Sequence, residues 1–174
     1  MISKEFDENL NALKSQDAEE VERAIRNLGE SSDQRAIPFL LDMLLKEHND
    51  NLRNVIALSL GSLKADDAVP ILIQLVKKPE LKNKRGSLVY ALQNLDCKNY
   101  FIDIVELICD GNYEVCNHAL DIFESLVDEI SYSEKLLAKQ RLSEQEQIEL
   151  ALPPSKHPKY DRIHFVRDAL KMID

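Results

Sequence analysis

Residues 58–76 read LSLGSLKADDAVPILIQLV, and residues 26–44 read RNLGESSDQRAIPFLLDML. In both stretches a Leu-Gly pair is followed, nine residues after the glycine, by a proline. The two stretches are offset by 32 residues, so that Gly29 aligns with Gly61 and Pro38 with Pro70. Five apolar matches share this offset: Leu28 with Leu60, Ala36 with Ala68, Ile37 with Val69, Leu40 with Leu72, and Leu44 with Val76. The chain therefore contains an internal repeat.

The repeated unit predicts two helices. Apolar residues recur at intervals of three and four, and the strict alternation of buried strands is missing. Pro38 and Pro70 fit the first turn of a second helix, where a backbone N–H has no intrahelical acceptor. Asp33 and Asp66 lie just upstream as predicted N-caps. Gly61 predicts either a close approach of two helices or a turn of the chain.

Weaker copies follow the first two. A third copy, 32 residues further on, keeps Leu92 and Ile104 but has Gln93 in place of glycine and Ile102 in place of proline. A fourth, VCNHALDIFESLV, retains only a first helix. A helical pair cannot cover its own apolar face, so such units stack around a continuous core. We predict helices over residues 3–14, 17–30, 34–48, 51–64, 67–78, 83–95, 98–109 and 113–130.

These residues resemble the short HEAT-like repeat found in bilin lyases. The stretch NLRNVIALSLGSLKADDAVPILIQLV has the arginine of the first helix (Arg53), the Leu-Gly pair, an acidic turn and Ala-Val-Pro opening helix two. The resemblance extends over residues 17 to about 130. It implies an all-α, armadillo-like α-solenoid of about four HEAT-like hairpins in residues 1–131. Residues 132–174 would form a helical C-terminal cap, or an appendage that binds a partner.

The C-terminal segment has a different pattern. YSEKLLAKQRLSEQEQIELAL is charged and weakly amphipathic, and Ser143 and Glu146 have the spacing of a capping box. Prolines interrupt the chain at 153, 154 and 158, before a last helix over residues 160–173. One apolar stripe is predicted on that helix, formed by Ile163, Val166, Leu170 and Ile173.

Composition limits the classes of function. The 174 residues include 22 basic and 31 acidic side chains, and the net charge of −9 argues against a nucleic-acid partner. A basic stretch, Lys77 to Arg85, is either a solvated loop or a contact. The chain has neither a run of about 18 apolar residues nor a secretory start, which predicts a cytoplasmic protein without a membrane partner. Three cysteines, an odd number, favour a reducing compartment.

We expect no enzyme activity, no cofactor and no metal. The sequence contains no phosphate-binding glycine loop, nucleophile elbow or HExxH motif. Cys109, Cys116 and His118 flank one predicted turn, but their spacing does not suit a zinc site. Cys116 and His118 are two residues apart on a helix and cannot face each other, so a thiol nucleophile with its base is not predicted there.

The resemblance implies that the second helices line the concave surface of the solenoid, where a protein partner would bind. Phe39 and Ile71 are apolar on this predicted face, either as anchors for a partner or because a loop or cap covers them. Asp42, Gln74 and Glu106 form a polar row that either contacts a basic ligand or keeps the groove hydrated. The full candidate set is Arg35, Phe39, Asp42, Lys46, Asp67, Ile71, Gln74, Lys78, Asp103 and Glu106.

The sequence is consistent with two classes of function. The first is a non-catalytic adaptor or scaffold that binds a basic protein, favoured by the acidic ends of the chain. A more specific version is an immunity protein that neutralises a basic toxin. The alternative, implied by the resemblance, is a bilin-lyase-like protein that handles a pigment.

Overall fold

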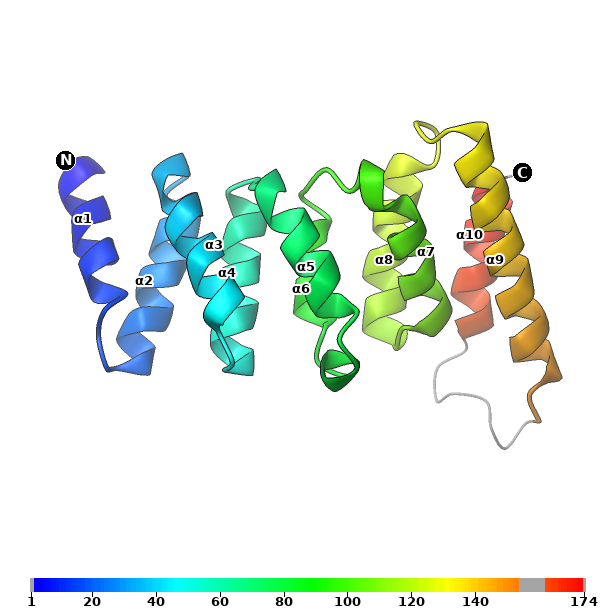
Figure 1. The fold of residues 1–174 in the computed structure, drawn as a ribbon, viewed down its shortest axis with the longest axis horizontal. Coiled ribbons are helices and arrows are strands. Elements are labelled where there is room, and N and C mark those ends of the chain that lie inside the picture. Colours follow the sequence, from blue (N-terminus) through cyan, green and yellow to red (C-terminus); the bar gives the residue numbers. More distant parts are fainter. Residues whose placement is uncertain (1, 154–161, 174) are drawn as a thin grey trace.

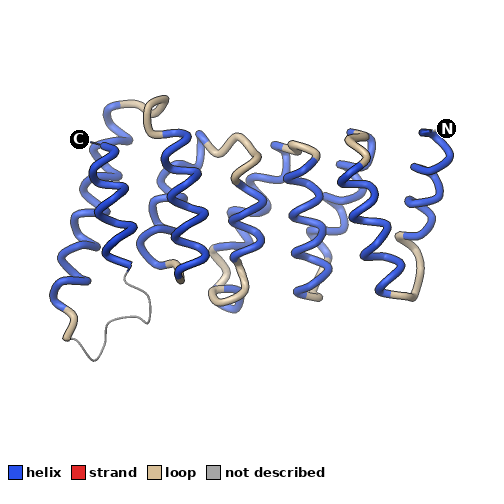
Figure 2. The backbone as a smooth tube through the Cα atoms, turned by 180° about the vertical axis from the view of Figure 1, so that it is seen from behind, coloured by secondary structure: helices blue, strands red, loops and turns tan. Residues whose placement is uncertain are grey.

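The computed structural model describes residues 2–153 and 162–173, and within them every regular element is a helix. Figures 1 and 2 show the stack from its two sides. The helices are α1 (Ile2–Ala12), α2 (Ala18–Glu30), α3 (Ile37–Lys46), α4 (Asp50–Ser62), α5 (Val69–Val76), α6 (Gly86–Leu92), α7 (Phe101–Asp110), α8 (Tyr113–Leu126), α9 (Tyr132–Ala151) and α10 (Arg162–Ile173). Short 3₁₀ turns span Gln34–Ala36, Asp66–Ala68, Pro79–Leu81 and Lys98–Tyr100. The predicted all-α solenoid is confirmed.

The helices form two rows. The even-numbered helices make the first row, in which α2 packs on α4, α4 on α6, α6 on α8 and α8 on α10. The odd-numbered helices make the second row, seen in front in Figure 1. Each second-row helix packs against the first-row helix that follows it in the chain, giving the pairs α1/α2, α3/α4, α5/α6, α7/α8 and α9/α10. One continuous core of apolar side chains runs between the rows.

The repeated glycines set the spacing of the first row. A Cβ on Gly29 would lie 2.8 Å from Ser59 Cα, and a Cβ on Gly61 would lie 2.9 Å from the carbonyl oxygen of Ala91. Neither glycine has a positive φ. Of the two roles predicted for Gly61, close helix approach is therefore confirmed and the turn is wrong. In the third repeat, Gln93 takes the glycine position and bonds to Asp121 of α8 at 2.7 Å.

The chain turns three residues after each glycine. Ser32 and Lys64 have left-handed φ values of 57° and 54°, and they too are 32 residues apart. Pro38 and Pro70 occupy the first turns of α3 and α5, as predicted. The prolines and these turn residues thus mark the end of one helix and the start of the next.

One of the two predicted acidic caps is wrong. Asp33 caps the turn before α3, because its carboxylate accepts the Arg35 N–H at 3.1 Å. Asp66 lies inside its own 3₁₀ turn, which begins after Ala65, and its carboxylate accepts the Asp96 N–H of the next repeat at 2.9 Å. The Asp66 side chain thus joins two repeats.

The predicted capping box at Ser143 and Glu146 is also wrong, since both residues lie within α9. The capping box that starts α9 is formed by Ser131 and Glu134, which have the same spacing. α9 packs on α7 and α10 packs on α8, so this last pair continues both rows. Of the stripe predicted on the last helix, Val166 is buried and Ile163, Leu170 and Ile173 are partly buried.

Candidate partner-binding surface

The candidate residues lie on the second-row helices α3, α5 and α7 and on the turns that flank them. The backbones of α3, α5 and α7 are spaced further apart than those of the first-row helices, which contact one another directly. The glycines draw the first-row helices together, and the location of the second helices on a concave surface stays a prediction.

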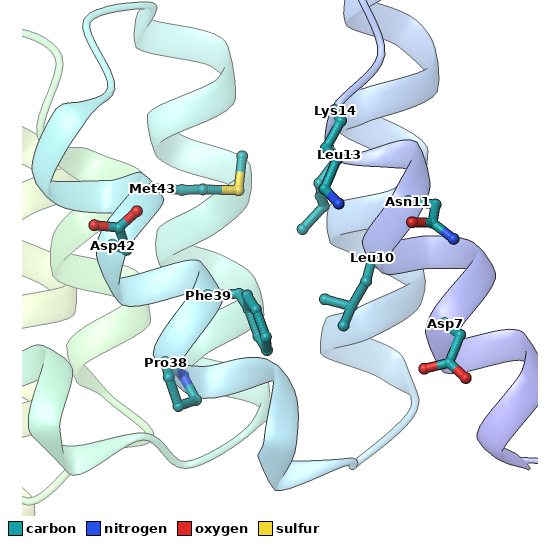
Figure 3. A pocket seen from close by; sticks show the side chains of 9 residues that line it. All are labelled: Asp7, Leu10, Asn11, Leu13, Lys14, Pro38, Phe39, Asp42 and Met43. Carbon is teal, nitrogen blue, oxygen red and sulfur yellow. The ribbon is translucent and has the colours of Figure 1, made fainter.

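The wider spacing of the second row opens an apolar groove between α1 and α3. The groove has a volume of about 670 Å³. Figure 3 shows Leu10 of α1 and Leu13 of the turn after it facing Phe39 and Met43 of α3, with Pro38 beside them. The Phe39 side chain is 48% exposed. Sequence reasoning found Phe39 but missed the leucines of α1, because α1 lies outside the aligned repeats.

Polar side chains surround this apolar surface. Asp7 and Asn11 of α1, Lys14 of the turn after α1, and Asp42 of α3 also line the groove. Asp42 forms an ion pair with the predicted residue Lys46 at 2.6 Å, and both side chains are well exposed. Such an exposed pair contributes little to stability, so a charged partner can compete for either side chain.

Arg35 lies in the 3₁₀ turn before α3 and is held by its neighbours. Its guanidinium pairs with Asp33 at 2.6 Å and lies over the Phe6 ring, 4.2 Å from the ring centroid. The hydrogen bond from Arg35 lowers the pKa of the Asp33 carboxyl below its usual value. Arg35 therefore fixes α1 against the turn before α3.

The predicted residues of α5 and its flanks separate into two kinds. Ile71 is partly buried and packs against the core, which matches the alternative that it is covered and weakens its assignment as an anchor. Asp67, Gln74 and Lys78 are exposed. The apolar part of the candidate surface is therefore confined to the groove at Phe39.

The predicted acids of α7 are bound by the chain itself. Asp103 pairs with Lys77. Glu106 accepts two hydrogen bonds from Arg141 of α9, at 2.7 and 3.0 Å, and these raise the pKa of Arg141. Because this fork joins α9 to α7, Glu106 is occupied and the hypothesis that it contacts a basic ligand loses support.

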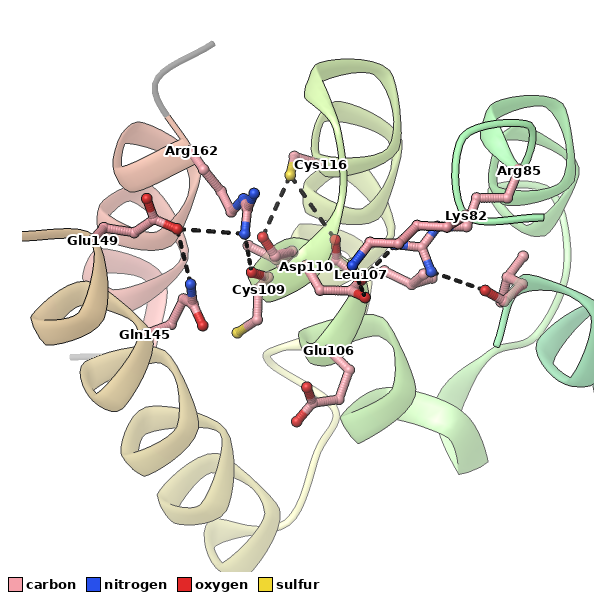
Figure 4. Close-up of polar contacts among 12 residues, drawn as sticks. Lys82, Arg85, Glu106, Leu107, Cys109, Asp110, Cys116, Gln145, Glu149 and Arg162 are labelled. Carbon is pink, nitrogen blue, oxygen red and sulfur yellow. Dashed lines mark hydrogen bonds and ion pairs between the residues drawn. The ribbon is translucent and has the colours of Figure 1, made fainter. Parts of the chain in front are cut away.

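The basic stretch Lys77 to Arg85 is also largely paired within the chain. Arg85 is 4% exposed and bonds to Asp110 at 2.5 Å and to the carbonyl oxygen of Val76 at 2.9 Å (Figure 4). Lys84 reaches Asp50 of the preceding repeat at 2.5 Å. These pairs favour a structural role for the stretch, in which its cations tie successive repeats together.

The three cysteines are unpaired and buried. Burial raises the pKa of Cys97 and of Cys109 to about 12 and that of Cys116 to about 11. The Cys116 thiol donates to the carbonyl oxygen of Ile108 at 3.4 Å (Figure 4). A thiol in this state is protonated at neutral pH and is a poor nucleophile. Among residues 2–153 and 162–173, no three His, Cys, Asp or Glu side chains gather as metal ligands.

Comparison with known proteins identifies the repeat. A family model described as HEAT repeats matches residues 6–93, half of the chain. The chain belongs to the HEAT repeat family. HEAT repeats generally mediate protein–protein interactions. No curated protein matches this HEAT repeat chain significantly. In the described part of the chain, no helix is both long and apolar enough to cross a membrane.

Proposed function

We propose that this HEAT repeat protein is a non-catalytic interaction module that binds another protein through the groove between α1 and α3. The observation that carries the proposal is the half-exposed Phe39 ring, which faces Leu10 and Leu13 across the groove. Large aromatic side chains at a well-formed apolar groove are frequent anchors of protein interfaces.

The groove favours an amphipathic helix as its occupant. One long wall is α1 with the turn after it, which supplies Leu10 and Leu13. The other wall is α3, which supplies Phe39 and Met43 one helical turn apart. A partner helix could place apolar side chains between these walls and leave its polar face in water.

The charge of the surface favours a basic partner. Asp7 and Asp42 line the groove, one on each wall, and the whole chain has a net charge of −9. Basic residues beside the apolar face of the partner helix would replace the exposed Asp42–Lys46 pair and speed association. An adaptor role is the plainest form of this function, and neutralisation of a basic toxin is a more specific form of it.

The test is affinity capture from extract of the native cell with three proteins. These are the natural chain, a Phe39→Ser variant and a Tyr90→Ser variant. Tyr90 is a matched control, because it is also half-exposed, at 46%, but lies on α6 in the first row. We expect Phe39→Ser to lose the captured protein and Tyr90→Ser to retain it, with both variants melting close to the natural chain. Loss of capture with Tyr90→Ser alone would place the binding surface on the first row and overturn the proposal.

A further inference from the structure

The last second-row helix, α9, has an unusual distribution of polar and apolar side chains. Its outward side exposes Tyr132 (82%), Leu136 (57%), Leu137 (50%), Ile148 (53%) and Leu150 (61%). Its inward side buries two polar residues, Gln145 and Glu149, besides Ala138 and Leu142. Glu149 is satisfied there by Gln145 and by Arg162 of α10, as Figure 4 shows. The larger apolar surface of α9 thus faces solvent.

This side of α9 lies at the end of the stack. The pair α9/α10 is the last of the five, and no helix of the described chain covers the outer side of α9 (Figure 1). The opposite end differs, because the exposed residues of α1 from Lys4 onward are polar. A stacked repeat protein needs a polar outer face at its ends to stay soluble, which α1 provides and α9 does not. The apolar side of α9 is therefore suited to a contact.

The apolar residues are arranged symmetrically about the middle of α9. Leu136 and Leu150 lie seven residues before and after Ser143, so two full turns separate each of them from Ser143 and all three share one side of the helix. Leu137 lies six residues before Ser143, and Ile148 lies five residues after it. If two copies of α9 cross in antiparallel orientation at Ser143, Leu136 of each copy meets Leu150 of the other. The small Ser143 side chains then allow a close crossing.

The two halves of α9 carry charges of opposite sign. Arg141 is held within the chain by Glu106 of α7, and Glu149 by Arg162 of α10. Apart from these two residues, the half before Leu142 has two cations, Lys135 and Lys139, and one acid, Glu134. The half from Leu142 onward has two acids, Glu144 and Glu146, and Glu146 also pairs with Arg167 of α10 at 2.7 Å. Antiparallel crossing sets the basic half of each copy against the acidic half of the other, whereas a parallel crossing would oppose like charges.

We propose that the outer side of α9 is a self-association surface, through which two copies of this protein join end to end in antiparallel, two-fold symmetric contact. The occupant of the surface is a second copy, because its apolar positions and its charges are both self-complementary. The contact leaves the groove between α1 and α3 open, so the inference is independent of the proposed function. A joined pair would present two such grooves on one particle.

Sedimentation equilibrium of the full chain over a range of concentrations tests the proposal. A single pair of helices makes a small interface, so we expect a dimer that forms reversibly as the concentration rises. Leu136→Ser together with Leu150→Ser removes four leucines per dimer and should raise the dissociation constant at least about a hundredfold. Leu45→Ser is the matched control, since Leu45 is 64% exposed on α3, and it should leave the dimer unchanged. A monomer at every concentration, or a dimer insensitive to the leucine variant, would overturn the proposal.

A charge exchange separates this geometry from other modes of association. One variant combines Lys135→Glu with Lys139→Glu, and the other combines Glu144→Lys with Glu146→Lys. Each variant alone should dimerise more weakly, because its two contacts oppose like charges. An equal mixture should form a heterodimer that neither variant forms alone. A mixture no more dimeric than its components would contradict the antiparallel contact, and circular dichroism of each variant verifies that it is folded.

Discussion

Replacing Gly29 with alanine tests whether glycine sets the close spacing of the first row. The added Cβ would lie 2.6 Å from Ser59 Cβ and 2.8 Å from Ser59 Cα, whereas carbon atoms pack at about 3.5 to 4.0 Å. Because one of the two atoms belongs to the backbone of α4, a change of side-chain rotamer cannot remove the clash. The helices α2 and α4 must separate by about 1 Å.

The magnitude follows from two opposing terms. Overpacking of a well-packed core costs about 1 to 3 kcal/mol. Alanine is better than glycine in a helix by at most about 1 kcal/mol, and less at Gly29, the penultimate residue of α2. We therefore expect a net destabilisation of about 1 to 2 kcal/mol. For a chain of this size, that free energy lowers the Tm by roughly 2 to 8 °C.

The assay is thermal and urea unfolding followed by circular dichroism. Gly61→Ala should lower the Tm less than Gly29→Ala does. The added Cβ would lie 2.9 Å from Ala91 O and 3.2 Å from Ala91 Cα, so a smaller separation of α4 from α6 removes the clash. Ser62→Ala is the control, since Ser62 is an exposed neighbour on α4, and its Tm should change little. An unchanged or higher Tm for Gly29→Ala would refute the claim that this glycine sets the spacing.

Three further predictions concern the turns, the ion pairs and the thiols. Lys64→Gly relieves a left-handed φ of 54° and should raise the free energy of unfolding by about 0.5 kcal/mol in urea titrations. Lys84 and Arg53 lower the pKa of Asp50, so the charged Asp50 stabilises the fold above its unfolded pKa of about 3.9 and loses this effect as the pH falls through its folded pKa. Asp50→Asn should therefore melt below the natural chain at pH 7, and the difference should shrink below about pH 4 in melts across pH. All three cysteines should resist a thiol reagent at pH 8 in the native protein and react once urea unfolds it, because burial raises their pKa values; rapid native labelling would contradict their burial.

The repeat and its helices could be predicted because they depend on local sequence. The 32-residue offset, the first-turn prolines and the apolar spacing act within one unit and its neighbour, and they predicted the helices over residues 17–130 closely. Capping needed more information, because Ser131–Glu134 and Ser143–Glu146 have the same spacing. Only the start of the helix decides between them, and an S-x-x-E pattern within a continuous helix caps nothing.

The candidate surface was harder to predict because it depends on how repeats sit against one another. The close spacing of the first row depends on the contact of Gly29 with Ser59 and of Gly61 with Ala91, and neither partner residue is marked in the sequence. Phe39 and Ile71 are equivalent by position, yet Phe39 lines the groove between α1 and α3 whereas Ile71 packs against the core. From the sequence, Glu106 is predicted to be a solvated acid, but in the structure it accepts hydrogen bonds from Arg141 of α9.

Photo-crosslinking in native cell extract tests the proposed binding surface most directly. A benzophenone amino acid is placed at position 39 in the groove, or at position 90 on the first row as the control. We predict that position 39 forms a crosslink to a protein partner and that position 90 does not. A crosslink from position 90 with none from position 39 would contradict it.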